Sequence, residues 1–153
     1  MSNKRVIIGG ILLLMLLFFY FKKTSVIQVS YPEGSFYLEE DRFELGWIHS
    51  VEKEPWFETF ELKDDELYLV TTRFKTFGAG TPSTGKVIPS TDGYIHMEMN
   101  QKMENISLVV SENVRTTLST NGSTYLLYEL VEDYETVTIE VKKIPWWLLR
   151  DKR

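Results

Sequence analysis

The sequence contains no cysteine, which excludes disulfides, thiolate zinc sites, a cysteine nucleophile and a lipid-modified cysteine. Acidic residues are missing from its first 23 positions, which hold four basic side chains. The remainder carries 13 Lys and Arg against 22 Asp and Glu, a net charge of −9. An acidic domain lacks the clustered positive charge that neutralises phosphates, so the chain is not expected to bind nucleic acid.

The one long apolar run, Val6–Phe21, lies between basic residues. As a helix its 16 residues would cover roughly 24 Å of a hydrocarbon layer about 30 Å thick. No A-x-A-like cleavage site follows, so an uncleaved signal anchor is favoured over a signal peptide. Residues 1–23 are predicted to be a single-pass transmembrane helix in the cell membrane. The domain after it is expected outside the cytoplasm.

Residues 24–145 show many short strands separated by turn residues and no amphipathic helix. This pattern predicts an all-β domain, either a compact sandwich or an open barrel. Besides a central hairpin, the predicted strands are Val26–Tyr31, Phe36–Leu38, Leu67–Phe77, Tyr94–Met99, Ile106–Ser111, Val114–Ser119, Thr124–Leu130 and a last strand around Val137, Ile139 and Val141.

The central hairpin places polar residues among hydrophobes. Phe43, Leu45, Trp47, His49 and Val51 alternate in one strand, and Trp56, Glu58, Phe60 and Leu62 alternate in the next. A turn at Glu52–Pro55 would pair Val51 with Trp56, His49 with Glu58, Trp47 with Phe60 and Leu45 with Leu62. The pattern therefore predicts a His49–Glu58 pair on the apolar face of the hairpin.

Two interpretations of this pair stay open. It could bind a ligand or a polar group of a partner, or it could be a satisfied polar pair that only determines strand register. A hydrogen bond between the two would raise the histidine pKa and lower the Glu58 pKa. Metal binding by His49, Glu52, Glu58 and His96 is not expected, because His96 should face away from the apolar side. No metal ion or other cofactor is predicted.

A second motif is the Gly-rich loop, residues 78–85. Its segment Gly80–Lys86 matches G-x-x-x-x-G-K, but Val87 stands where a phosphate-binding loop has Ser or Thr, and no helix follows. Nucleotide binding is therefore rejected. We expect Gly78 and Gly80 to allow a positive φ or a close backbone approach. Residues 146–153 form an aromatic and basic tail that could lie at a membrane interface or close one end of the core.

The hairpin and the loop together carry a family resemblance. The segment His49-Ser50-Val51-Glu52, then Pro55 and Glu58, and later Gly78-Ala79-Gly80-Thr81-Pro82, resemble the domain-of-unknown-function 1850 (DUF1850) family of small bacterial proteins. The similarity covers roughly residues 26–145. Members are typically encoded beside tripartite TRAP-type transporters of the TAXI class. The resemblance implies site residues at His49, Ser50, Glu52, Glu58, Gly78, Gly80 and Pro82, and a loop that lies beside the hairpin.

We therefore expect a non-enzymatic accessory subunit of a TRAP-type secondary transporter for organic acids. Its implied partners are the multi-span transporter subunit, the TAXI-type substrate-binding protein and the membrane. A small-molecule module that binds or senses a carboxylate at the cell surface is the alternative. A metal-dependent hydrolase is a third possibility. Among the 22 acidic residues, an acid pair for glycoside hydrolysis also stays open, but nothing singles one out.

Overall fold

The computed structural model describes residues 2–148, with side chains from Ile7 onward. The described chain forms two units, one comprising Val26–Val141 and one that combines the two chain ends, up to Ser25 and from Lys142. The larger unit is all-β, as predicted, apart from one short helix.

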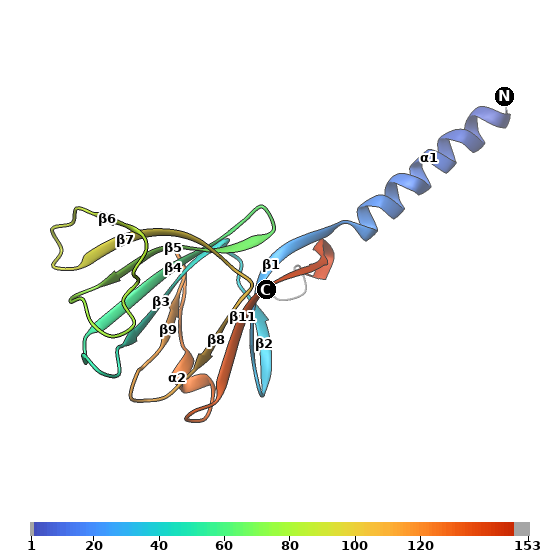
Figure 1. The fold of residues 1–153 in the computed structure, drawn as a ribbon. Helices are drawn as coiled ribbons and strands as arrows, with labels where there is room; N and C mark the ends of the chain where they lie inside the picture. Colours follow the sequence, from blue (N-terminus) through green and yellow to red (C-terminus); the bar gives the residue numbers. More distant parts are fainter. Residues whose placement is uncertain (1, 149–153) are drawn as a thin grey trace. The chain divides into compact units, whose positions relative to one another are not determined.

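Two antiparallel sheets make up the β domain (Figure 1). The larger sheet has the order β10-β9-β3-β4-β5-β7-β6 and the smaller one the order β2-β1-β11-β8. The large sheet comprises β3 (Arg42–Ile48), β4 (Pro55–Lys63), β5 (Glu66–Phe74), β6 (Lys86–Ile88), β7 (Ile95–Met103), β9 (Thr117–Ser119) and β10 (Thr124–Leu126). The small sheet comprises β1 (Lys23–Tyr31), β2 (Gly34–Tyr37), β8 (Asn105–Val109) and β11 (Thr136–Pro145).

The core lies between these sheets, so the sandwich is the observed architecture. Residues from both are almost completely buried, as alternation requires of strands with one face inward. The contributing side chains include Ile27, Val29, Ile106, Val137 and Ile139 from the small sheet, and Phe43, Leu45, Phe60, Leu67 and Leu118 from the large one. Phe43 and Phe60 are cross-strand partners whose rings stack at 5.2 Å.

Several predicted strands have different ends in the structure. The strand predicted at Thr124–Leu130 stops at Leu126 and continues as the short helix α2 (Leu127–Leu130), whose Leu127 enters the core. The strand predicted from Val114 begins only at Thr117, because Arg115 has a φ of 49° that interrupts extended backbone. β5 ends at Phe74 rather than Phe77.

The smaller unit contains α1 (Ser2–Phe21) and the tryptophans of the tail. The indole Nε1 of Trp146 donates to the carbonyl oxygen of Phe19 at 2.7 Å, and that of Trp147 donates to Tyr20 at 3.3 Å. The Trp147 ring stacks on the Tyr20 ring at 5.7 Å. The tail therefore caps carbonyls of the last helical turn, which have no N–H partner within the helix. The predicted tail residues 149–153 lie outside the described residues.

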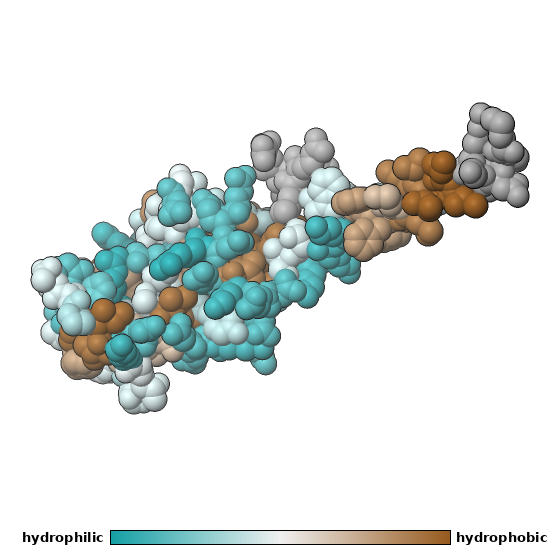
Figure 2. All heavy atoms as spheres, turned by 90° about the horizontal axis from the view of Figure 1, so that it is seen from above, coloured by the Kyte–Doolittle hydropathy of each residue, from teal (hydrophilic) through white to brown (hydrophobic). Residues whose placement is uncertain are grey.

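α1 coincides with the apolar run, and its crossing of a membrane stays a prediction. Among the described residues, no helix is both long enough and apolar enough to span a bilayer. Large hydrophobic side chains between Ile7 and Phe21 are 44–70% exposed, and Figure 2 shows this helix covered with hydrophobic residues.

Candidate functional site

The β3–β4 hairpin has a different register from the predicted one. Trp47 pairs with Trp56 and Leu45 with Glu58, so the predicted pairings of Trp47 with Phe60 and Leu45 with Leu62 are wrong. The shift amounts to four residues, an even number, which leaves every side chain on its predicted face. Hydrophobic alternation determines which side chains of a strand point to the core, and the observed register leaves these side chains on their predicted faces.

The turn explains the shift. The N–H of His49 donates to the Glu54 carbonyl at 2.8 Å, and the N–H of Lys53 donates to the His49 carbonyl at 3.0 Å. Lys53 closes the turn in the left-handed region, with a φ of 58°. The turn thus lies two residues earlier than predicted, which leaves Val51 exposed at the tip rather than opposite Trp56. We call residues 49–54 the hairpin tip.

Glu52 joins the hairpin tip to the Gly-rich loop. One carboxylate oxygen faces His49 Nδ1 in an ion-pair contact, and the other accepts a hydrogen bond from the Ala79 N–H at 2.9 Å. This N–H lowers the pKa of Glu52 below its ordinary value of 4.5, with smaller contributions from the backbone N–H of Glu52 and the charge of His49. The charged carboxylate therefore links two motifs that are separated by about 25 residues in the sequence.

Two of the three glycines in this loop, Gly78 and Gly80, lie against the hairpin tip. A Cβ at Gly78 would collide with the Glu52 carboxylate, so only glycine admits the bridge. Gly80 has a φ of 76°, and a Cβ there would lie 3.9 Å from His49 Nε2. The structure thus places the loop directly beside the hairpin tip.

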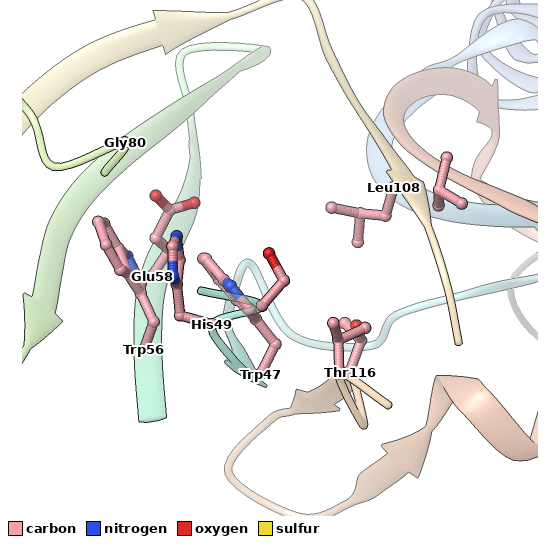
Figure 3. Close-up of a pocket in the computed structure, with 10 residues that line it drawn as sticks. Trp47, His49, Trp56, Glu58, Gly80, Leu108 and Thr116 are labelled. Atoms are coloured by element: carbon pink, nitrogen blue, oxygen red, sulfur yellow. The ribbon is translucent and has the colours of Figure 1, made fainter. Parts of the chain in front are cut away.

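A cavity of about 360 Å³ opens next to this bridge, between the large sheet and β8. Figure 3 shows Trp56, Glu58, His49 and Trp47 along one side, with Leu108 and Thr116 across from them. The lining residues are Trp47, His49, Ser50, Trp56, Glu58, Gly80, Leu108, Val109, Val114 and Thr116. Four predicted site residues, His49, Ser50, Glu58 and Gly80, meet here. Glu52 contacts His49, and Gly78 lies against Glu52, but neither lines the cavity. Pro82 does not line it either.

Trp56 is the central side chain of this wall. It is buried, its indole stacks on Trp47 at 5.8 Å and on the His49 ring at 5.5 Å, and it contacts Phe74 at 4.8 Å. Its Nε1 donates to the buried hydroxyl of Thr72 at 2.9 Å, which satisfies the only polar group of the indole. This packing determines where the imidazole lies.

Glu58 differs from the prediction in its partner. Within the described chain, the imidazole of His49 is paired with Glu52, and the cross-strand neighbours of Glu58 are Leu45 and Thr72. Burial raises the pKa of Glu58 from 4.5 to about 7, and the nearby Trp56 offsets only part of this effect. The expected lowering of the Glu58 pKa by His49 is therefore wrong. The two side chains share a cavity without forming the predicted pair.

His96 lies apart from these residues. It is paired across the strands with Arg73, and its Nε2 contacts a carboxylate oxygen of Asp92 at 2.9 Å. No three metal-binding side chains converge within the part of the chain that the structure describes.

Sequence reasoning missed the far wall of the cavity. Leu108 and Val109 come from β8, and Val114 and Thr116 from the segment before β9. Their alternation signalled strands, but no local signal shows which strand of one sheet faces which strand of the other.

Comparison with known proteins identifies the family of the chain. A family model described as "Domain of unknown function (DUF1850)" matches residues 43–127, which are 85 of the 153 residues. The chain belongs to the DUF1850 family. Every residue that lines the cavity lies inside the DUF1850 match, as do the hairpin tip and the Gly-rich loop. No curated protein and no solved structure shows significant similarity to the chain.

Proposed function

We propose that this DUF1850 protein is a membrane-attached, non-enzymatic accessory subunit of a TRAP-type secondary transporter for organic acids. The observation that carries the proposal is the bridge through Glu52, which joins the hairpin tip and the Gly-rich loop. These are the two motifs on which the family resemblance rests. We infer that they form the surface that contacts the multi-span subunit or the TAXI-type binding protein, with the β domain outside the cytoplasm.

Membrane attachment through α1 is part of this proposal. A helix with apolar side chains on all sides needs a nonpolar environment, and the large side chains of α1 are exposed in the isolated chain. Aromatic residues cluster at its C-terminal end, where Trp146 and Trp147 join them. Such clusters favour the headgroup level of a bilayer, and Lys22 follows directly.

We expect the double variant Leu14→Glu/Phe18→Glu to leave the membrane fraction. Each buried charge opposes membrane partition by about 2.5–3.5 kcal/mol. Parent and variant are compared by sedimentation of cell lysates and immunoblotting of pellet and supernatant. Leu130→Glu, which adds a charge at a half-exposed position of the β domain, is the control and should sediment like the parent. A parent that stays in the supernatant would contradict membrane attachment.

For the transporter role, we expect the full-length protein to co-purify with a multi-span transporter subunit from its native membrane. His49→Ala and Glu52→Ala should each reduce recovery of that subunit at least about tenfold, a loss of about 1.4 kcal/mol or more. Glu52→Ala removes the acceptor of the Ala79 hydrogen bond that holds the hairpin tip against the Gly-rich loop, and His49→Ala removes the imidazole that faces this carboxylate. Recovery is measured by quantitative mass spectrometry after affinity purification in mild detergent.

His96→Ala is the matched control, since it removes an imidazole paired with Asp92 on the other face of the sheet. It should co-purify like the parent. Equal recovery for all three variants would defeat the proposed contact surface. Unchanged transport after deletion of the protein would defeat the accessory role.

The cavity supports a second candidate, a small-molecule-binding module at the cell surface. Its volume of about 360 Å³ lies in the lower part of the range of ligand sites. A carboxylate ligand would be disfavoured there, because among the described lining residues only His49 can carry a positive charge, and it already faces the Glu52 carboxylate.

A further inference from the structure

Of the two ionisable side chains in the described lining, one already has a charged partner and the other does not. Among the described residues that line it, only His49 and Glu58 can titrate, and none is Lys or Arg. The Nδ1 atom of His49 already faces the Glu52 carboxylate, so an imidazolium charge would be neutralised there. Glu58 is the remaining ionisable group without a charged partner on its neighbouring strands.

Because Glu58 is partly buried, a nearby positive charge would stabilise its ionised form. A carboxylate removed from water loses hydration energy that only a nearby positive charge or hydrogen-bond donors can restore. Its cross-strand neighbours, Leu45 and Thr72, supply no charge, and hydrogen bonding from Trp56 restores only part of this energy. A ligand with a positive group beside Glu58 would restore this energy, whereas an anion would be repelled.

The walls suit an organic cation rather than a hydrated metal ion. Trp47 and Trp56 line one side, and Leu108 and Val114 contribute apolar surface from the other elements (Figure 3). The faces of indole rings attract cations, and alkyl groups on the cation lose little when they leave water.

We propose that the cavity binds a small organic cation, an amine or a quaternary ammonium. Its charge pairs with Glu58, and its alkyl groups lie against the partly exposed Trp47 indole and the apolar side chains across the cavity. This site goes beyond the transporter role and does not depend on it.

The proposal predicts stronger binding at higher pH. Within the described part of the chain, His49 is the only titratable side chain that shares the cavity with Glu58. The lining residues from β8, and from the segment between β8 and β9, are Leu108, Val109, Val114 and Thr116. Because the pKa of Glu58 is about 7, the carboxylate is mostly ionised at pH 8. Affinity should therefore fall roughly 30-fold between pH 8 and pH 5.5.

The test is titration calorimetry of the full chain in nonionic detergent, with choline and n-butylammonium as probes. At least one should bind at pH 8, and choline should bind at least about tenfold more tightly than its neutral isostere 3,3-dimethyl-1-butanol. Glu58→Gln should remove this preference. Glu61→Gln, which removes the same charge near an exposed Arg42, should retain it.

Three results would overturn the proposal. The first is failure of both cations to bind to the folded parent. The second is equal affinity for choline and the neutral isostere, which would indicate a merely apolar cavity. The third is an unchanged preference in Glu58→Gln, or tighter binding of succinate than of either cation.

Discussion

Glu58→Gln should stabilise the protein at pH 8 and flatten the pH dependence of its stability. In the folded state burial raises the pKa of Glu58 from 4.5 to about 7. Between these values the folded chain keeps a proton that the unfolded chain has lost, so the free energy of unfolding falls as pH rises. The contribution is complete below pH 4.5 and lost above pH 7, and amounts to about 3 kcal/mol. Glutamine keeps the shape without the charge.

The measurement is urea unfolding of the full chain in nonionic detergent at pH 5 and pH 8. Other carboxylates titrate in both proteins, so the difference between parent and variant isolates Glu58. We expect Glu58→Gln to gain about 2.5 kcal/mol more at pH 8 than at pH 5. Glu61→Gln should show no such pH-dependent gain, since its carboxylate is half exposed beside Arg42. A variant whose stability follows the parent at both pH values would refute a raised pKa for Glu58.

The hairpin shows which part of the fold local pattern determines. Alternation correctly assigned Phe43, Leu45 and Phe60 to the inner face, where they are almost completely buried. It could not determine the register, because any even shift keeps the same faces. The register was decided by the turn, in which Lys53 adopts a positive φ. Lysine gives no strong signal for that conformation, unlike glycine or asparagine.

The site was predictable only in part for a related reason. His49, Ser50 and Glu58 stand out as polar residues within or beside an apolar pattern, and Gly80 stands out as a loop glycine. The cavity that contains Glu58 is closed on its other side by residues such as Leu108 and Thr116, which come from a distant part of the chain. Sheet-on-sheet packing brings them together, and no local spacing encodes it. The sign of the Glu58 pKa shift therefore followed from tertiary structure.

Trp56→Ala should be the most destabilising single change at the cavity. The side chain is 6% exposed and contacts Trp47, His49 and Phe74. Removing a buried indole loses its transfer free energy and leaves a larger void, at a cost of about 3–5 kcal/mol. The variant also removes the ring on which His49 stacks. Urea unfolding of the full chain at pH 8 measures the loss.

Trp56→Phe separates packing from hydrogen bonding. It retains an aromatic ring beside His49 but removes the donor to Thr72, whose hydroxyl can still donate to the Phe57 carbonyl at 3.4 Å. Its cost should therefore be about 1–2 kcal/mol, well below that of Trp56→Ala. Equal losses in the two variants would show that the hydrogen bond to Thr72, rather than the aromatic stack, holds this wall in place. If packing dominates, Trp56→Phe should keep the imidazole beside Glu52 and retain co-purification, whereas Trp56→Ala should lose it.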